Sequence, residues 1–290
     1  MSKKHPVVAV TGSSGAGTTT VKRAFEHIFY RDGIKAAVVE GDSFHRYTRV
    51  EMRKKVSEGL SHFGPEANHF DKIADLFKTY GETGSGKKRY YLHSPEEAAE
   101  HNARLSCEQK PGEFTPWEKI TPGTDLLFYE GLHGMVVNGK VDVAKHVDLG
   151  VGVVPIVNLE WIQKIFRDNA ERGYSEEAIV DTIMRRMPDY INHITPQFSR
   201  TDINFQRVPT VDTSNPFIAR DIPTPDESFV VIRFSHPRKF DINFPYLLSM
   251  IDNSFMSRRN SIVVPGGKMG FAMEIILQPI IEQMMDARNV

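Results

Sequence analysis

A short glycine-rich turn near the N-terminus constrains the fold of this chain more than any other segment. The turn reads Gly12-Ser13-Ser14-Gly15-Ala16-Gly17-Thr18-Thr19. An apolar, β-branched run at residues 7–11 precedes it, and a stretch compatible with a helix follows at residues 20–30. A strand, a glycine-rich turn and a helix in this order predict a phosphate-binding loop (P-loop) in an α/β sheet.

The backbone of this turn is suited to bind phosphate, although its usual cation is missing. Glycines permit positive φ angles and close approach of a ligand, successive N–H groups form a nest for anions, and the following helix adds its N-terminal partial charge. Thr19 occupies the position whose hydroxyl reaches Mg²⁺, but Thr18 stands where the usual motif has lysine. The glycine spacing does not match a dinucleotide fingerprint, and the alternative is an ordinary Gly/Ser-rich turn. The residues expected to bind nucleotide are Gly12, Ser13, Ser14, Gly15, Ala16, Gly17, Thr18, Thr19 and Thr20.

Composition and charge limit the classes of partner. The 290 residues are 40% hydrophobic and 25% charged, which is typical of one large α/β domain or two small ones. A net charge of −1 gives no general attraction to nucleic acid or to an anionic membrane, and the apolar runs are too short to span a bilayer. The first residues lack the pattern of a signal peptide, and the single cysteine, Cys107, excludes a disulfide within the chain. We therefore expect a cytoplasmic protein without nucleic-acid or membrane partners.

The rest of the chain alternates between strand and helix patterns. We expect strands at residues 35–40, 125–130 and 147–157, helices at 50–60, 71–80, 159–171 and 176–194, and loops at 61–70 and 81–86. Such alternation predicts βαβ units and a mainly parallel sheet flanked by helices. After residue 196 we expect strands at 203–211 and 229–234 as antiparallel additions, then a closing helix at 271–288 that is interrupted at Pro279. No domain boundary is evident, so we expect one P-loop domain over residues 1–290, with the nucleotide and substrate core in 1–195 and a sheet extension in 196–290.

Two carboxylates follow predicted strands. Asp42 comes directly after the strand at 35–40, and Glu130 ends the strand at 125–130. Ligands of open α/β sheets bind outside the carboxyl ends of the strands, so both acids are expected at the nucleotide-binding edge. Glu130 has the position of an acid that helps to hold Mg²⁺. The alternative is that acids in such turns cap helices, although Ser43 is a better candidate for that cap than Asp42.

Transfer of a phosphoryl group to a hydroxyl also needs a group that accepts the hydroxyl proton. Asp42 is the candidate for this general base because it stands off the nucleotide strand, beside His45 and Arg49. Arginine binds phosphate with two hydrogen bonds and histidine can share that load, so this cluster suggests an acceptor that is itself a phosphate ester. The alternative is an ordinary charged surface loop.

A cationic helix is the third candidate part of the site. Lys164, Asp168 and Arg172 are spaced four residues apart and share one face, a stripe about 12 Å long. Gly173 ends this helix and places Arg172 at a corner that can close over transferring phosphates. Lys164 could supply the charge that is missing from the P-loop. The alternative is a solvated face with ordinary ion pairs between successive turns.

Four segments together resemble the phosphoribulokinase family. They are residues 12–19, the run G-D-S-F-H-R at 41–46, E-G-L-H at 130–133, and R-D-x-x-E-R-G at 167–173. They occur in that family's order, the likeness extends over essentially the whole chain, and the threonine in place of the P-loop lysine is similar to the bacterial form. Uridine kinases and pantothenate kinases are broader relatives that share the P-loop and the lid helix.

The resemblance implies that Mg-ATP phosphorylates D-ribulose 5-phosphate at its C1 hydroxyl, giving ribulose 1,5-bisphosphate for carbon fixation in the Calvin cycle. The catalytic residues it implies are Asp42 as base, Lys164 and Arg167. The residues implied to bind the sugar phosphate are His45, Arg49 and Arg172. The metal ligands expected from the motif and the resemblance together are Thr19, Glu130 and Asp168.

Regulation is implied by the resemblance alone. Plant members of the family are switched by a dithiol pair with one cysteine in the P-loop, where this chain has Ala16, so a chain with one cysteine cannot form that switch within itself. Similar bacterial enzymes are activated by NADH, inhibited by AMP and assembled as homo-oligomers. Arg31 and Arg233 are candidate contacts for such effectors, and the alternative for Arg31 is simple solvation at the end of a helix.

Two other functions stay open from the residues. One is a uridine or pantothenate kinase, but a neutral acceptor would not need His45, Arg49 and Arg172 together. The other is a nucleotide-sensing protein in which Thr18 marks lost catalysis, but a binding module needs no proton acceptor such as Asp42.

Overall fold

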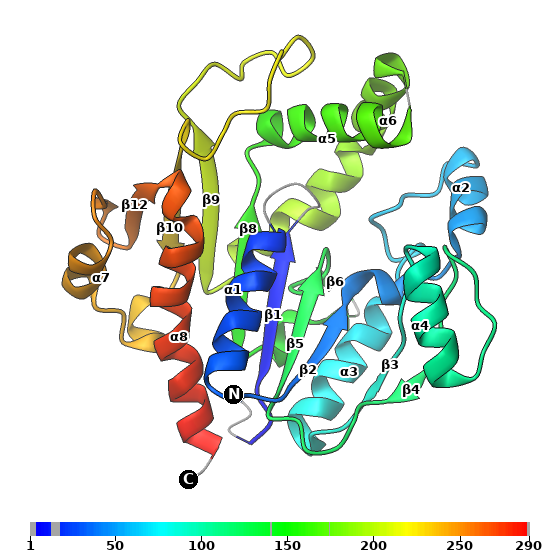
Figure 1. Ribbon diagram of the computed structural model, residues 1–290, viewed down its shortest axis with the longest axis horizontal. Coiled ribbons are helices and arrows are strands. Elements are labelled where there is room, and N and C mark those ends of the chain that lie inside the picture. The colour runs from blue at the N-terminus through cyan, green and yellow to red at the C-terminus, as the bar shows by residue number, and fades with distance from the viewer. Residues whose placement is uncertain (1–3, 13–17, 140, 174, 289–290) are drawn as a thin grey trace.

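A mixed sheet of eight strands forms the centre of the protein in the computed structural model, which describes residues 4–12, 18–139, 141–173 and 175–288 (Figure 1). The strand order is β11-β12-β10-β9-β8-β1-β5-β2. The bounds are β1 (Val7–Gly12), β2 (Ala36–Glu40), β5 (Leu126–Gly131), β8 (Leu149–Val154), β9 (Ile203–Pro209), β10 (Ser228–Phe234), β11 (Phe255–Arg258) and β12 (Ser261–Pro265). Two small ladders lie outside it, β3 (Lys87–Lys88) with β4 (Glu118–Lys119) and β6 (Val137–Asn138) with β7 (Val141–Asp142).

The pairing of the strands confirms the predicted class, a mainly parallel core with antiparallel strands in the last third. β2, β5, β1, β8 and β9 pair in parallel, and β10, β12 and β11 continue the sheet with antiparallel pairs. One expectation was wrong, because β9 is parallel to β8 and only its other edge, against β10, is antiparallel. β11 and β12 were not predicted.

Alternate residues of β1 point to opposite faces of the sheet, and both faces are covered. Val8 and Val10 pack in a core with Phe25 of α1 (Thr18–Arg31) and Ile276 of α8 (Met269–Arg288). Val7 and Ala9 face a second core with α3 (Phe70–Thr83). Figure 1 shows α1 and α8 side by side on the first face. Burial on both faces explains why β1 is apolar throughout.

Two helix boundaries differ from the predicted ones. α8 continues through Pro279 instead of being interrupted there, because apolar residues on both sides of the proline, including Leu277 and Ile280, are buried against the sheet. The helix predicted at 176–194 ends as an α-helix at Asp189 and continues as one π-helical segment, η3 (Tyr190–Ile194). α4 (Pro95–Leu105), which begins after the N-cap Ser94, was not predicted.

The remaining helices lie around the carboxyl ends of the parallel strands and at the far edge of the sheet. Figure 1 shows α5 and α6 beyond the ends toward which β1 and β5 point. As predicted, α5 ends at Gly173. This glycine adopts the left-handed conformation, with φ of 65°. The bounds are α2 (Arg49–Ser57), α5 (Val157–Arg172), α6 (Glu176–Asp189) and α7 (Phe244–Met250).

One hydrophobic core contains residues from both predicted parts of the chain, among them Val151, Phe205 and Ile232. This arrangement supports the single domain over residues 1–290, which stays a prediction. Among the residues described, every helix is too short or too polar to cross a membrane.

Candidate active site

Two glycines let the ends of β2 and β5, next to the predicted carboxylates, approach closely at the carboxyl edge of the sheet. Glu40 at the end of β2 pairs in register with Glu130 of β5, and Gly41 and Gly131 follow these residues. A Cβ atom on Gly131 would lie only 2.6 Å from the Cα atom of Gly41, closer than real Cβ contacts. Both positions therefore require glycine, and their close approach sets Asp42 beside the strand that carries Glu130.

Asp42 lies in a 3-10 turn, η1 (Gly41–Phe44), with 43% of its side chain exposed. His45 Nε2 lies 3.9 Å from one carboxylate oxygen of Asp42, and His93 Nε2 lies 3.8 Å from the other. Burial lowers the pKa of His45, although the charge of Asp42 acts in the opposite direction. Ser43 caps no helix, since its hydroxyl donates to the Glu40 carbonyl. The Asp42 carboxylate is thus placed between two imidazoles and open to a substrate.

A cavity of about 800 Å³ opens in front of Asp42, between α2, α5 and α6. The cations that line it are Arg49, Arg53, Lys164, Arg185 and Arg186, and its carboxylates are Asp42 and Asp168. His45, also predicted, lines the cavity too. An excess of cations around a solvent-filled cavity favours an anionic ligand. Three of the residues predicted for base and substrate binding are therefore together.

Lys164, Arg167 and Asp168 form a partly buried cluster on α5. Asp168 is 3% exposed and pairs with both Lys164 Nζ and Arg167 Nε, the latter at 3.2 Å. Burial lowers the pKa of Lys164, while its hydrogen bond with Asp168 acts in the opposite direction. A carboxylate this deeply buried is not part of a solvated surface face, which was the alternative reading of this helix. Lys164 and Asp168 line the cavity, whereas Arg167 contacts it through Asp168.

Part of the predicted site lies outside the described residues. This holds for residues 13–17 of the P-loop and for the side chains of Thr18, Thr19 and Arg172. Gly12 is the last residue of β1, and Thr20 lies exposed in the first turn of α1. The nucleotide-binding role of residues 13–19 and the role of Arg172 in closing over the phosphates therefore stay predictions.

The described residues contain no group of three or more His, Cys, Asp or Glu side chains that could hold a metal by itself. Mg²⁺ at a nucleotide does not need such a group, because it keeps several waters and binds one or two carboxylates plus the substrate phosphates. Glu130 at the end of β5 and Asp168 on α5 offer the right hard oxygen donors, so the donor set fits magnesium. Asp168 would share its carboxylate between the metal and its two cations.

A second segment of the site, residues 89–93, was not predicted from the sequence. Arg89, Tyr91 and His93 are spaced by two in an extended stretch, so they share one face. Arg89 donates to the carbonyls of Ser43 and His45, Tyr91 OH accepts from Arg49 Nε at 3.2 Å, and His93 lies against Asp42. The alternation was visible in the sequence, but nothing in it indicated which segment this face would contact. His62, whose pKa burial lowers to about 3, was missed as well.

A small cavity of about 250 Å³ lies beside Thr20, the last of the predicted nucleotide-binding residues. Val154, Ile156 and Leu159 give it an apolar wall, and its polar lining residues include Glu160, Gln163 and Arg207. Gln163 Oε1 is buried and has no hydrogen-bond partner among the residues that the structure describes. An apolar wall together with a few polar groups that can fix orientation suits a flat heterocyclic base.

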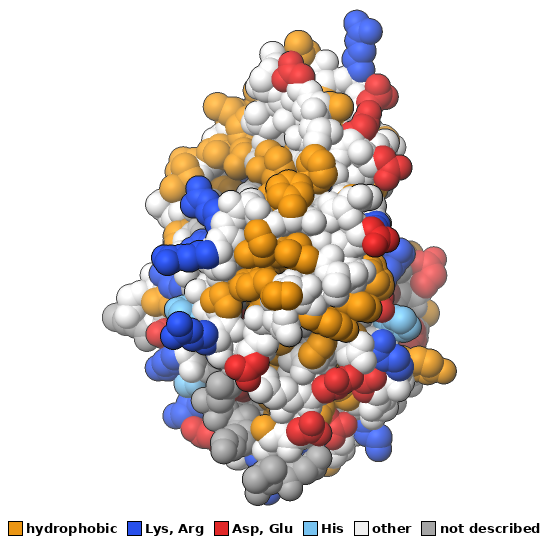
Figure 2. Space-filling view, turned by 90° about the vertical axis from the view of Figure 1, so that its left-hand side faces the viewer, with side chains coloured by type: hydrophobic (Ala, Val, Ile, Leu, Met, Phe, Trp, Pro, Cys, Tyr) orange, Lys and Arg blue, Asp and Glu red, His pale blue; other side chains and the backbone are white. Residues whose placement is uncertain are grey.

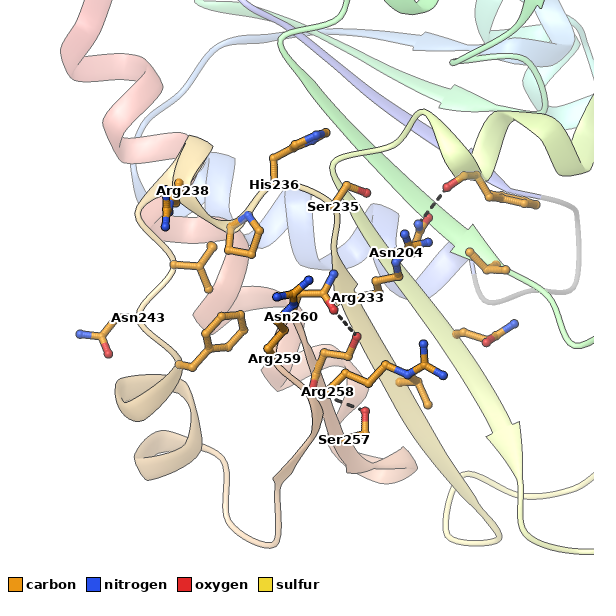
Figure 3. Close-up of a pocket in the computed structure, with 18 of the residues that line it drawn as sticks. Asn204, Arg233, Ser235, His236, Arg238, Asn243, Ser257, Arg258, Arg259 and Asn260 are labelled. Carbon is orange, nitrogen blue, oxygen red and sulfur yellow. Dashed lines mark hydrogen bonds between the residues drawn. The ribbon is translucent and has the colours of Figure 1, made fainter.

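The two predicted effector residues, Arg31 and Arg233, lie outside the cavity in front of Asp42, and they do not share a cavity with each other. Arg31 ends α1 and pairs with its neighbour Asp32 at 3.0 Å. Arg233 of β10 lines a separate cavity of about 1630 Å³, which Arg31 does not line (Figure 3). The other basic residues in this cavity are His236, Arg238, Arg258 and Arg259. Asp241 is the one carboxylate among the described residues that line it, so this cavity too is strongly cationic.

Comparison with known proteins agrees with the resemblance seen in the motifs. Residues 7–214 match the model of the phosphoribulokinase / uridine kinase family. The chain is 60% identical to the chromosomal phosphoribulokinase of Cupriavidus necator and 61% identical to that of Xanthobacter flavus, each over 100% of this chain and 99% of the relative. A solved structure, phosphoribulokinase from Rhodobacter spheroides, superimposes with a TM-score of 0.88 at 52% identity, covering 99% of this chain and 100% of that one. The chain belongs to the phosphoribulokinase / uridine kinase family.

Proposed function

We infer that this protein transfers the γ-phosphoryl group of ATP to the C1 hydroxyl of D-ribulose 5-phosphate, giving ADP and D-ribulose 1,5-bisphosphate for the Calvin cycle. The observation that carries this inference is the cation-lined cavity in front of Asp42, in a chain about three-fifths identical over its full length to phosphoribulokinases. Neither uridine nor pantothenate carries a phosphate that would need five cations. A sensor without catalysis would not need a carboxylate base at the mouth of this cavity.

The proposed chemistry gives each group of site residues one role. The C1 hydroxyl donates its proton to the Asp42 carboxylate as the bond from its oxygen to the γ-phosphorus forms and the bond to the ADP oxygen breaks. His45, Arg49 and Arg172 hold the 5-phosphate of the sugar, so that binding energy from the remote phosphate orients the hydroxyl. Lys164 and Arg167 neutralise charge on the transferred group, which in a loose transition state is spread over its outer oxygens.

Magnesium, bound with ATP, would be held by Thr19, Glu130 and Asp168 and would neutralise phosphate charge there. The residues from Gly12 to Thr20 would hold the phosphates, with backbone N–H groups in place of the missing lysine. The cavity beside Thr20 would take the base of the nucleotide.

The direct test is substrate-dependent release of ADP. The purified protein is incubated with Mg-ATP and, in parallel, ribulose 5-phosphate, uridine or pantothenate. We expect turnover with ribulose 5-phosphate only. Faster turnover with uridine or pantothenate would assign the protein to another branch of the family, and nucleotide binding without any turnover would favour a sensor.

We propose that the second cavity binds an anionic nucleotide effector, NADH as activator or AMP as inhibitor. Arg233 lies on β10, Arg258 ends β11 and Arg259 follows in the turn to β12, the strand between them. The arginines of this cavity lie around one hollow in Figure 3 and have no carboxylate partner among the described residues. Calorimetry with NADH and AMP tests this. Arg233→Ala should weaken binding without changing the KM for ATP, whereas Arg31→Ala tests the other predicted contact.

We also propose that the chain forms a homo-oligomer and works in the cytoplasm, where ATP and sugar phosphates are made. Figure 2 shows hydrophobic side chains gathered on the face that lies to the left in Figure 1, the side of α7 and α8. Tyr246 and Met250 of α7 and Phe271 of α8 are at least 40% exposed, as is Phe255 on the edge strand β11. Such a patch suits a second copy of the chain. Sedimentation of the wild type and of Phe271→Asp tests the proposal.

A further inference from the structure

Arg89 is a cation in an unusual setting, behind the turn that carries the proposed base. It follows the short strand β3 and is partly buried. No carboxylate pairs with it among the described residues, although a buried charge normally requires a partner of opposite sign. Burial alone lowers its pKa to about 10, so the guanidinium group stays protonated at neutral pH.

The guanidinium group instead binds two backbone carbonyls and two aromatic rings. Its Nε donates to the Ser43 carbonyl at 2.7 Å and its Nη2 donates to the His45 carbonyl at 2.6 Å. Its central carbon lies 3.7 Å from the centre of the Phe114 ring and 4.7 Å from that of the Trp117 ring. Hydrogen bonds from a charged donor are stronger than neutral ones, and aromatic faces stabilise a guanidinium group.

We call residues 41–45, which carry Asp42 and His45, the catalytic turn. The two hydrogen bonds from Arg89 complete the pairing of the backbone carbonyls in its last four residues. The Asp42 carbonyl accepts from His45 N–H and the Phe44 carbonyl accepts from His69 N–H. Arg89 binds the other two carbonyls of this stretch, those of Ser43 and His45. One side chain therefore fixes the peptide planes between Ser43 and Phe44 and between His45 and Arg46, and so holds the turn from which the side chains of Asp42 and His45 project.

We propose that Arg89 is a positioning residue for phosphoryl transfer, whose guanidinium group holds the turn of Asp42 and His45 in its reactive geometry through the carbonyls of Ser43 and His45. It does not reach the cavity itself, so it acts through the residues it holds. This proposal rests on the proposed role of Asp42. Its test compares kcat between variants, whereas the test of the proposed function measures the activity of the wild type.

The shape of the donor matters as much as its charge. A guanidinium group presents parallel N–H donors in a planar fork, whereas an ammonium group is a compact point charge with one main direction at a time. Arg89→Lys keeps the charge but cannot span both carbonyls and stack on Phe114 in the same way. We therefore expect lysine to replace Arg89 poorly.

The experiment compares Arg89→Ala and Arg89→Lys with a matched control, Arg104→Ala. Arg104 also stacks on an aromatic ring, Tyr90, but it is exposed and pairs with Glu118 at 2.8 Å, away from the catalytic turn. Because displacements near 1 Å in an active site can cost about 10²-fold, we expect kcat to fall by roughly that factor in Arg89→Ala. The affinity for Mg-ATP, measured by calorimetry, and the melting temperature with Mg-ATP bound should change little.

Chemical rescue separates positioning from general support of the fold. Removing the Arg89 side chain beyond Cβ leaves a slot against Phe114 and Trp117 that methylguanidinium can enter. Millimolar methylguanidinium should raise the kcat of Arg89→Ala by about tenfold, whereas methylammonium at the same concentration should not. Neither salt should change Arg104→Ala or the wild type.

Two results would overturn the proposal. One is a kcat for Arg89→Ala near that of Arg104→Ala. The other is a low kcat that methylguanidinium does not restore, together with a lowered melting temperature, which would make Arg89 a support of the fold only. If Arg89→Ala does not fold, Arg89→Lys decides: full activity in a folded lysine variant contradicts the need for two hydrogen bonds. If the wild type itself does not turn over ribulose 5-phosphate, the proposed function fails first, and that outcome is visible without any variant.

Discussion

Replacing Lys164 with methionine tests whether α5 supplies the positive charge that is missing from the P-loop. Methionine keeps most of the length and apolar stem of the side chain but removes its charge. In the structure Lys164 Nζ binds the Asp168 carboxylate and also lines the cavity in front of Asp42. The substitution therefore has two separable effects, one on stability and one on catalysis.

The effect on stability follows from the burial of Asp168, which is 3% exposed. Breaking a buried ion pair usually costs about 3–5 kcal/mol. Arg167 stays 3.2 Å from the carboxylate and keeps it paired, so we expect a smaller loss, about 2 kcal/mol. At about 2–4 °C per kcal/mol for a chain of this size, the melting temperature should fall by about 4–8 °C.

The effect on catalysis should be larger. A fixed charge aimed at the transferred phosphoryl group is comparable with an oxyanion-hole donor, whose removal costs about 10²–10³-fold in kcat. The assay is steady-state release of ADP with saturating Mg-ATP and ribulose 5-phosphate. Lys164→Arg, which keeps the charge, should retain more activity than Lys164→Met.

A double variant separates the two effects. In Lys164→Met with Asp168→Asn the buried negative charge is removed as well, so the melting temperature should return toward that of the wild type, while kcat stays low. Asp168→Asn alone is the control, because Asp168 is itself a proposed metal ligand. A kcat for Lys164→Met close to that of the wild type would refute the relocation of charge to α5 and leave Thr18 without an explanation.

Two further predictions concern the strand ends and pH. Gly131→Ala should lower both the melting temperature and kcat, because its Cβ would lie 2.6 Å from the Cα of Gly41 and overpacking typically costs about 1–3 kcal/mol; a variant with wild-type stability would contradict the close approach. Burial lowers the pKa of His62 to about 3 from 6.5, so the unfolded chain binds a proton that the folded protein rejects. The stability that depends on neutral His62 is fully present above pH 6.5 and is lost as the pH falls toward 3. In His62→Asn the melting temperature should therefore fall less steeply between pH 6.5 and 3. An unchanged slope would contradict this prediction.

The sequence was sufficient to predict the parts of the site that follow strands. Asp42 and Glu130 come directly after apolar runs, and parallel strands present their carboxyl ends at one edge, so local pattern already implies spatial proximity. The spacing of Lys164 and Asp168 likewise predicts a shared helix face, and the structure pairs them. Local periodicity was thus sufficient to predict a contact when both residues lie on the same helix or strand.

The parts that failed depend on contacts between distant segments. Arg89 and His93 contact the catalytic turn from positions 44 to 51 residues later in the sequence. No local sequence pattern indicates that these segments are in contact. Pro279 does not interrupt α8, because burial on both sides of it outweighs the lost backbone hydrogen bond. β11 and β12 are short strands whose place at the sheet edge is set by pairing rather than by their own pattern.

The most direct test of the account is the kcat of Asp42→Asn with Mg-ATP and ribulose 5-phosphate. Asparagine keeps the shape of the side chain and the contacts with His45 and His93 but cannot accept the hydroxyl proton. We expect kcat to fall by about 10²–10⁴-fold, the usual contribution of a general base, while calorimetry shows unchanged binding of Mg-ATP. A kcat near that of the wild type would contradict Asp42 as the base.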